Sequence, residues 1–388
     1  MSYDPDVPFD DFYARLIELR DTVLIPNERR VRELAEIPDD ILELIRDIGL
    51  FAISIPRQYG GRGYTMEEQV KTHFVLCQAS AVYRARVSTT IGLGSQPILD
   101  HGTEDQKQRY LPKLAAGEMT ASFALTEPEA GSDAAALSTT ATPDGNGWRL
   151  NGTKRFITNS RQADVFLVMA RTDDGDRGAR GISAFLVPAG TPGLSVGEAD
   201  AKMGQEASQT AEVYFEDCRA EGDSMVGTEG NGFKVALRGI NHARLHIGAT
   251  CVAQAIRLTK EAYRYAHGRQ QFGQAIAEHQ LVQAMLADCR AETLAARSMV
   301  LETARTFDTG TIPIGDIACC KYFASEMLCR VADRAVQIHG GQGYMQSSDV
   351  EWLYRDARLF RIYEGTSQIQ QGLIAKEMAK AGDVGLWE

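Results

Sequence analysis

The hydrophobic pattern of this 388-residue chain changes its period twice, which excludes an all-α or all-β fold. In the first third, apolar residues from Ile41 to Ile48 recur at helical spacing, between an N-cap signal at residues 38–40 and Gly49. Residues 69–93 and 104–114 carry helical patterns as well. We therefore predict packed helices over residues 1–120, as an N-terminal all-α domain.

The middle of the chain has the composition of strands. Residues 164–170, 182–187 and 211–215 are rich in β-branched and aromatic side chains. Asn151-Gly152 supplies a turn signal beside an alternating run that begins at Gly147. We predict a small β domain over residues 121–228.

After Gly232 the helical period returns. Residues 280–304 place their apolar side chains on one face, as expected of a long bundle helix. A break at residues 309–313 precedes a second helix over residues 317–338, which ends at Gly340-Gly341. We predict a C-terminal all-α domain over residues 229–388 and a mixed α+β architecture for the whole chain.

Composition narrows the class of protein. Lys and Arg total 41 against 52 Asp and Glu, and a net charge of −11 disfavours a nucleic-acid partner. The seven cysteines are scattered without a CxxC pair, which is typical of reduced thiols rather than of disulfides or a zinc site. His242, His246 and His339 lack metal-ligand spacing, so no metal is assigned. We see no leader and no membrane-spanning stretch, and we expect a cytoplasmic location.

One carboxylate near the C-terminus has an unusual setting. Glu364 lies between Tyr363 and Gly365, with apolar residues on both sides. In an apolar pocket a carboxylate becomes a stronger base, which suits abstraction of a carbon-bound proton. Gly365 lets a substrate approach closely because it has no Cβ. Taken alone, this segment is more typical of a solvated surface glutamate than of a catalytic residue.

A second segment strengthens the functional interpretation of Glu364. It spans residues 123–133 and reads Phe-Ala-Leu-Thr-Glu-Pro-Glu-Ala-Gly-Ser-Asp. In this order and spacing, the two segments resemble the acyl-CoA dehydrogenase family of flavoenzymes. The resemblance runs from Phe12 to Lys380 and includes residues 155–159, 269–273, 337–341 and 354–356. It implies a helical bundle, a β-barrel-like middle domain and a second helical bundle, assembled as a homotetramer that binds FAD.

The resemblance assigns FAD contacts to two sets of residues. The set that serves FAD in its own chain comprises Phe123, Leu125, Thr126, Gly131, Ser132, Phe156, Ile157 and Thr158, while Thr366 and Gln368 would reach the adenosine end of the cofactor. The set that reaches the FAD of a neighbouring subunit comprises Arg269, Gln337, Gly340 and Gly341, and Phe272 and Gln280 are further FAD contacts. Ordinary turn capping at Thr126 and Ser132, and a helix C-cap at Gly340-Gly341, are the structural alternatives.

The resemblance also assigns the chemistry. It makes Glu364 the catalytic base, which removes the α-proton of an acyl-CoA thioester while a β-hydride moves to the flavin. The alternative base position of some family members is occupied here by Ala243. The residues assigned to the substrate are Ser132, Asn241, Arg244, Tyr363, Gly365 and Arg84. Arg244 is either a support for the site or one partner of a structural salt bridge.

Arg84 and Arg86 bear on the substrate. Residues two apart on a helix point roughly 200° apart, so at most one faces the pocket and the other is expected in solvent. Arg84 falls where glutaryl-CoA dehydrogenases carry the arginine that binds a distal carboxylate, and Arg86 falls near an arginine of sulfinopropionyl-CoA desulfinases. The presence of Glu364 weakens the desulfinase interpretation. A plain short or medium fatty acyl-CoA, with both arginines in solvent, stays open.

The sequence thus predicts an FAD-dependent acyl-CoA dehydrogenase of fatty acid or carboxylic acid catabolism. The resemblance implies that it passes electrons to an electron-transferring flavoprotein. Two alternatives stay open. One is an acyl-CoA oxidase of the same fold, and the other is a flavin-free helical binding protein on this scaffold.

Overall fold

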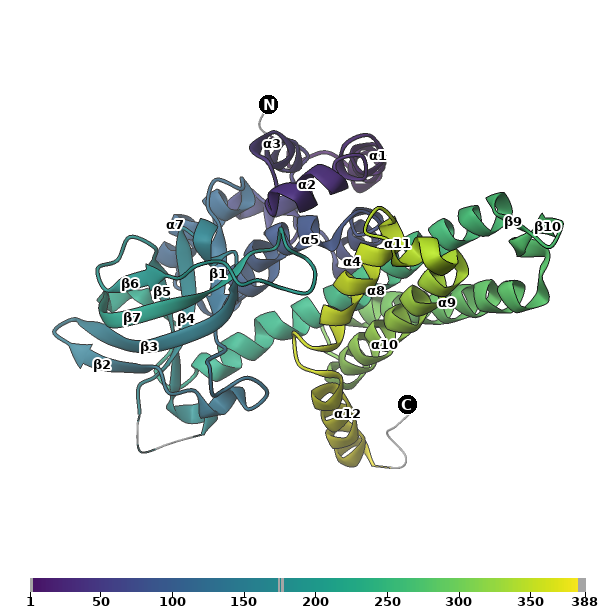
Figure 1. Ribbon diagram of the computed structural model, residues 1–388. Coiled ribbons are helices and arrows are strands. Elements are labelled where there is room, and N and C mark those ends of the chain that lie inside the picture. Colours follow the sequence, from purple (N-terminus) through teal and green to yellow (C-terminus); the bar gives the residue numbers. More distant parts are fainter. Residues whose placement is uncertain (1–2, 174, 176–177, 383–388) are drawn as a thin grey trace.

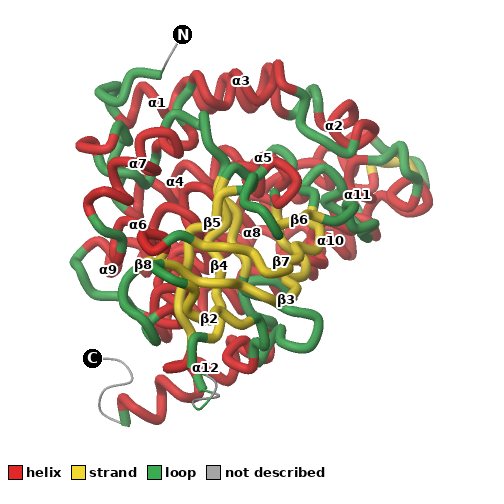
Figure 2. Tube along the Cα trace, turned by 90° about the vertical axis from the view of Figure 1, so that its left-hand side faces the viewer, coloured by secondary structure: helices red, strands yellow, loops and turns green. Residues whose placement is uncertain are grey.

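The computed structural model describes residues 3–173, 175 and 178–382. Its sheet lies at one side, its C-terminal helices lie at the other, and the long helix α8 runs between them (Figure 1). The N-terminal helices cover the junction, and Figure 2 shows the sheet against a background of helices. The predicted α+β architecture is confirmed. No helix in the described part of the chain is long and apolar enough to cross a membrane.

The N-terminal helices pack around a core that includes Phe12, Leu16, Ile45 and Tyr83. The predicted helical stretch 69–93 is divided, because Ser80 caps a new helix by accepting a hydrogen bond from the Val82 N–H. A π-helical segment, η4 (Thr89–Gly94), then continues this second helix. The α-helices are α1 (Phe9–Leu19), α2 (Glu28–Leu34), α3 (Asp39–Asp47), α4 (Met66–Leu76), α5 (Ala81–Ser88), α6 (Ser95–His101) and α7 (Glu104–Ala115).

The middle of the chain forms a sheet with strand order β6-β7-β3-β2-β4-β5-β8, in which β1 pairs in parallel with β4. Both faces are covered, so β4 is buried along its whole length. The strands are β1 (Ala121–Ala124), β2 (Thr140–Asp144), β3 (Gly147–Thr158), β4 (Val165–Arg171), β5 (Ile182–Pro188), β6 (Leu194–Val196), β7 (Thr210–Ala220) and β8 (Met225–Val226).

The predicted turn at Asn151-Gly152 is wrong, because both residues lie inside β3. The register between β3 and β7 shifts there, and Gly152 has φ +151°. A Cβ at this position would clash with Thr139, so glycine serves a close approach inside the sheet. The β2–β3 hairpin turns instead at Gly145-Asn146, since Asp144 pairs with Gly147.

The C-terminal helices form a bundle around α8 (Gly232–Gly268), whose 37 residues extend for about 55 Å. It packs against α4, α9 (Gln280–Asp308) and α10 (Ile314–His339). A short hairpin of β9 (Gln270–Gln271) and β10 (Gln274–Ala275) joins α8 to α9.

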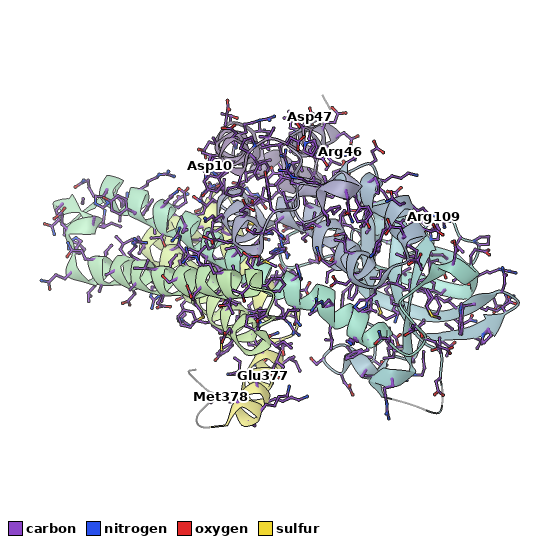
Figure 3. All side chains as sticks on the ribbon, turned by 180° about the vertical axis from the view of Figure 1, so that it is seen from behind. Asp10, Arg46, Asp47, Arg109, Glu377 and Met378 are labelled. Atoms are coloured by element: carbon purple, nitrogen blue, oxygen red, sulfur yellow. The ribbon has the colours of Figure 1, made fainter. Side chains whose placement is uncertain are left out.

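The chain then passes through α11 (Asp349–Ala357) to α12 (Ser367–Ala381). Glu377 and Met378 lie on the part of α12 that extends beyond the bundle (Figure 3).

Candidate active site

Glu364 lies in a turn between the short helix η11 (Arg358–Arg361) and α12. It has φ +56°, and Gly365 follows with φ +90°. A residue with a side chain rarely adopts such a φ, and the conformation persists only where its surroundings fix it. The Tyr363–Thr366 turn, which we call the base turn, is therefore the first structural sign of a functional site.

Three side chains hold the two carbonyl groups of the base turn. Arg244 Nε donates to the Glu364 carbonyl at 3.0 Å, and Lys321 Nζ donates to the Gly365 carbonyl at 2.6 Å. Gln370 Nε2 donates to both carbonyls, at 3.1 and 3.2 Å. These contacts come from α8, α10 and α12, so the base turn is fixed from three directions.

The electrostatics of Glu364 suit a base. Burial raises its pKa, while the nearby charges of Arg84, Arg244 and Lys321 act in the opposite direction. A carboxylate whose pKa is raised has a stronger affinity for a proton, as the removal of a weakly acidic proton requires. The N–H of Glu364 donates to no backbone or side-chain group among the residues that the structure describes, and so can serve a ligand.

Arg244 and Asn241 lie one turn apart on α8. Arg244 Nη1 donates to Asn241 Oδ1 at 3.1 Å, and the arginine is almost fully buried. Its hydrogen bonds thus go to an amide and to the base turn, and within the described ranges no carboxylate lies within 4 Å as an ion-pair partner. Ala243, between them, is also buried. Arg244 therefore supports the base turn rather than a structural salt bridge.

Arg84 and Arg86 on α5 point to different surroundings. Arg84 is only 4% exposed, and its Nε has no hydrogen-bond partner among the described residues. Its charge lowers the pKa of His73 and opposes the rise in the pKa of Tyr363 and of Glu364, which places it on the side of the base turn.

Arg86 is directed elsewhere. Its Nη2 donates to Thr120 Oγ1 at 3.0 Å, and its guanidinium lies over the Phe51 ring. Burial lowers the pKa of Arg86 to about 10. Contrary to expectation, neither arginine is fully in solvent, because Arg84 is buried and Arg86 is only partly exposed.

The loop of residues 125–132 lies beside the end of β3, since the Arg155 N–H donates to the Thr126 carbonyl at 2.8 Å. A buried ion pair supports it: Lys154 Nζ donates to Glu127 Oε1 at 2.7 Å and to the Leu125 carbonyl at 3.1 Å. Burial acts to raise the pKa of Glu127, but the Lys154 ammonium and the hydrogen bonds of Ser138 and Thr139 outweigh it and lower that pKa to about 2.

Phe156 shows a second strained conformation. Its φ is +59°, it lies at a register shift between Lys154 and Ile157, and its ring is 58% exposed. Ile157 beside it is buried in the core of the sheet, so only its backbone can face a ligand. The strained bulge thus turns an aromatic side chain outward.

The hydroxyls of Thr126, Ser132 and Thr158 donate to no partner within the described ranges. Gly131 has open space where a Cβ would lie. Phe123 is partly buried on β1, next to Ser122, whose hydroxyl donates to the Thr158 carbonyl at 2.6 Å. An exposed aromatic ring, unpaired hydroxyls and an open glycine in one place fit a flat, polar cofactor such as a flavin.

Asn159, directly after β3, connects this face to α5. Asn159 Nδ2 donates to the carbonyls of Ala85 and Arg86 and to Thr89 Oγ1, at 3.1, 3.3 and 2.6 Å. The end of β3 therefore lies against the helix that carries Arg84.

The residues assigned to the FAD of a neighbouring subunit, together with Phe272 and Gln280, gather at the far end of the C-terminal bundle. Arg269, Phe272 and Gln280 lie at the α8–α9 hairpin, and Phe272 is 94% exposed. Gln337, Gly340 and Gly341 end α10, and the His339 ring stacks on Tyr265 of α8 with 4.2 Å between centroids. The structure brings these six residues to one end of the bundle, and no side-chain contact joins them to the base turn.

Thr366 and Gln368 belong to the start of α12. Thr366 caps the helix, with its hydroxyl accepting from the Ile369 N–H at 3.2 Å, and Gln368 is exposed. Capping is thus one role of Thr366, as its position before a helix would suggest.

Sequence reasoning missed two lysines, Lys154 and Lys321. Both are fully buried in the structure, and each donates to a backbone carbonyl of a segment that sequence reasoning had singled out. The signal was present for Lys321, which lies in the apolar run between Ile317 and Ile338. A charged residue on the buried face of a helix is expensive unless it is paired or hydrogen-bonded.

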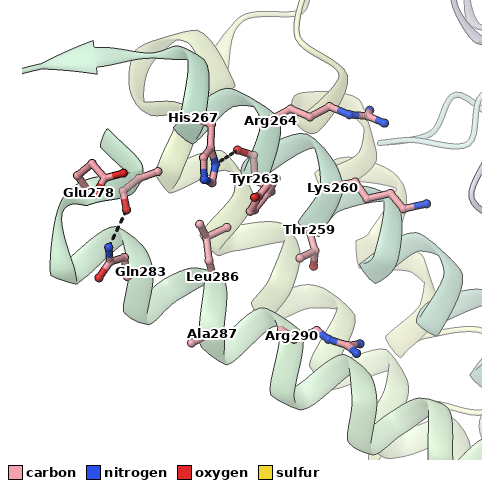
Figure 4. Close-up of a pocket in the computed structure, with 11 residues that line it drawn as sticks. Thr259, Lys260, Tyr263, Arg264, His267, Glu278, Gln283, Leu286, Ala287 and Arg290 are labelled. Atoms are coloured by element: carbon pink, nitrogen blue, oxygen red, sulfur yellow. Dashed lines mark hydrogen bonds between the residues drawn. The ribbon is translucent and has the colours of Figure 1, made fainter. Parts of the chain in front are cut away.

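A surface groove of about 730 Å³ lies between α8 and α9 near the hairpin (Figure 4). Lys260, Arg264 and Arg290 give it a basic rim. Its residues on α8 lie 15 or more positions beyond Arg244, roughly 20–35 Å along the helix. The groove is therefore separate from the base turn.

Comparison with known proteins identifies the family of this chain. The N-terminal, middle and C-terminal domain models of the acyl-CoA dehydrogenase family match residues 11–118, 122–218 and 230–379. The chain therefore belongs to the acyl-CoA dehydrogenase family.

Three similar proteins illustrate the family. The caffeyl-CoA reductase–Etf complex subunit CarC of Acetobacterium woodii is 37% identical over 350 residues, which cover 90% of this chain and 92% of that protein. The structure of butyryl-CoA dehydrogenase from Megasphaera elsdenii has a TM-score of 0.93 at 32% identity and covers 98% of this chain and 100% of that one. The FAD complex of PigA has a TM-score of 0.92 at 28% identity, with 98% and 100% covered.

Proposed function

We propose that this chain catalyses the FAD-dependent α,β-dehydrogenation of an acyl-CoA thioester to the trans-2-enoyl-CoA, with Glu364 as the base. The observation that carries the proposal is the base turn. A partly buried carboxylate with a raised pKa is held in a left-handed conformation by three side chains, and its own N–H is left free. Such a group takes up a proton readily and does not move.

When bound, FAD supplies the acceptor for the hydride that leaves the β-carbon. Thr126, Ser132 and Thr158 would hold it with their hydroxyls, and Phe156 would lie against it. The carboxylate of Glu364 removes the α-proton, and the N–H of Glu364 donates to the thioester oxygen as negative charge develops there. The similar proteins support this chemistry, since one is a butyryl-CoA dehydrogenase and another is an FAD complex.

The electron acceptor we propose is an electron-transferring flavoprotein. The relative from Acetobacterium woodii is named as a subunit of a reductase–Etf complex. Its name also points to the reverse reaction, reduction of an enoyl-CoA, in which Glu364 would return the proton. Rapid oxidation of the reduced flavin by oxygen alone would instead favour an acyl-CoA oxidase.

The central test is Glu364→Gln, which keeps the shape of the side chain and removes the base. We expect the variant to bind acyl-CoA and FAD, and we expect anaerobic flavin bleaching to slow by about 10²–10⁴-fold. Glu377→Gln, on the projecting part of α12, is the matched control and should bleach like the wild type. Bleaching of Glu364→Gln at the wild-type rate would place the base elsewhere. A colourless wild-type protein without FAD would favour the flavin-free binding protein.

For the substrate, we propose an acyl chain with an acidic distal end, which pairs with Arg84. Arg84, Arg244 and Lys321 surround Glu364 with three cationic groups against one carboxylate. Burying a guanidinium with an unbonded Nε is expensive, and a second carboxylate from the substrate would offset this cost.

Two variants of the same helix test this assignment. We would compare kcat/KM for butyryl-, octanoyl- and glutaryl-CoA in the wild type, Arg84→Met and Arg86→Met. The expected result is a preference for glutaryl-CoA that Arg84→Met loses and Arg86→Met retains, because Arg86 is directed to Thr120 and Phe51. A wild type that prefers the unsubstituted chains, with no effect of Arg84→Met, would refute the acidic substrate.

A further inference from the structure

Lys321 is a buried cation that contacts the base turn but takes part in no chemical step of the proposed reaction. It lies on α10, its side chain is 0% exposed, and burial lowers its pKa to about 8. Its Nζ donates to the Gly365 carbonyl at 2.6 Å, and it forms no ion pair within the described ranges. A buried ammonium without a counter-ion is costly, so a purely structural site would be more stable with an apolar residue there.

The position of this hydrogen bond matters because of peptide planarity. Arg244 holds the Glu364 carbonyl and thereby the plane of the Glu364–Gly365 peptide. Lys321 holds the Gly365 carbonyl and thereby the plane of the next peptide. Two fixed successive peptide planes determine both φ and ψ of Gly365. Without these two hydrogen bonds, a glycine at φ +90° could adopt other backbone conformations at little cost.

We propose that Lys321 is a positioning residue for proton abstraction, which acts through the Gly365 carbonyl to fix the carboxylate and the N–H of Glu364. This inference rests on the proposed role of Glu364 as the base. The ammonium also contributes positive charge next to the carboxylate, together with Arg84 of α5 and Arg244 of α8.

The test is Lys321→Met, which keeps most of the side-chain volume and removes the charge and the donor. We expect anaerobic flavin reduction to slow by about 10- to 100-fold, as a misplaced catalytic group does, with little change in the dissociation constant of acyl-CoA. The rising limb of the rate against pH should move to higher pH, because a cation that lowers the pKa of Glu364 is gone.

A second readout needs neither FAD nor substrate. Amide hydrogen exchange of residues 363–366 in the apoprotein should be about tenfold faster in Lys321→Met than in the wild type. Lys321→Gln, which keeps a donor without charge, should show an intermediate exchange rate and the same displaced pH limb. This milder variant decides the question if Lys321→Met does not fold.

Thr303→Val is the matched control. Thr303 is buried, and its hydroxyl lies 3.2 Å from the Sγ of Cys320, next to Lys321, but it does not contact the base turn. It should reduce stability without changing exchange at residues 363–366 or the pH limb.

Wild-type exchange and an unmoved pH limb in both Lys321 variants would overturn the inference. Such a result would leave the base itself untouched, because Glu364→Gln tests that separately.

Discussion

The base turn and the α8–α9 hairpin each contain two consecutive residues of positive φ, but this conformation serves a different purpose in each. Glu364 and Gly365 have φ +56° and +90°, and Phe272 and Gly273 have φ +53° and +82°. In the base turn, three side chains of the same chain fix both carbonyls. In the hairpin, pairing of Gln271 with Gln274 requires two residues of positive φ, and nothing lies within 4 Å of a Cβ at Gly273.

The base turn is thus fixed by side-chain contacts within its own chain, whereas no side chain among the described residues donates to the carbonyls of Phe272 and Gly273. The base turn needs no partner to hold Glu364, whereas the hairpin presents a 94% exposed aromatic ring that only another molecule can cover. We therefore propose that the base serves its own chain, and that Arg269 and Phe272 serve the FAD of a neighbouring subunit.

The largest difference is expected between Gly365→Ala and Gly273→Ala. Both introduce a Cβ at positive φ, but at Gly365 it would lie 2.7 Å from Gln370 Nε2 and 3.3 Å from Arg244 Nη2. We expect Gly365→Ala to slow flavin reduction by about 100-fold, because a small displacement of a catalytic group has that effect. Gly273→Ala should stay within about threefold of the wild type, at a strain of roughly 1 kcal/mol. Anaerobic stopped-flow measurements give the rate of flavin reduction in both variants. Equal rates would contradict the proposed difference between the base turn and the hairpin.

A smaller effect is expected from Arg269→Ala and Phe272→Ser. Neither residue packs in the core, so the unfolding of the isolated chain should not change. FAD affinity should fall about tenfold, which corresponds to about 1.4 kcal/mol, and assembly should weaken with it. Equilibrium dialysis of FAD and sedimentation velocity measure the two quantities. If both variants retain FAD as the wild type does and form a full-size assembly, the hairpin does not contribute to the cofactor site.

The smallest effect concerns stability against pH. The folded-state pKa of Glu364 is raised, so the folded protein retains a proton that the unfolded chain releases. Stability should therefore fall as pH rises from the unfolded pKa of Glu through the folded value. Glu364→Gln removes this slope and should be more stable than the wild-type apoprotein at pH 8, with no gain at pH 4. Urea unfolding at both pH values measures it, and a variant less stable than the wild type at pH 8 would contradict the direction of the shift.

Period and composition predicted most of the fold. The strands β4, β5 and β7 and the helices α7, α9 and α10 lie where their patterns indicated. The turn predicted at Asn151-Gly152 was wrong because an Asn-Gly pair also suits a bulge inside a strand. The glycine is needed there because Thr139, on the neighbouring part of the chain, comes close, and the sequence pattern does not reveal this contact. The break at Ser80 was missed because a cap and a helical residue can be the same amino acid.

Sequence reasoning about the site found the reactive segments but not what holds them. Glu364 and residues 123–132 stood out by their neighbours in sequence. Lys321, 43 positions away from Glu364, and Lys154 are identified only when the fold brings them to a backbone carbonyl. The directions of Arg84 and Arg86 were likewise undetermined, because helical geometry separates two side chains without saying which faces the site.

The most direct test of the account mixes two chains that are impaired in different ways. Glu364→Gln removes the base, and Arg269→Ala weakens the FAD clamp, which the account assigns to the partner's site. In a mixed assembly, the Arg269→Ala chain keeps its own Glu364 and receives Arg269 from its neighbour. At limiting FAD, a refolded equal mixture should recover roughly a quarter of the wild-type flavin reduction, as random pairing of two chains gives. No recovery above the sum of the separate variants would show that Arg269 does not serve a neighbouring site, and the account of the two regions would be wrong.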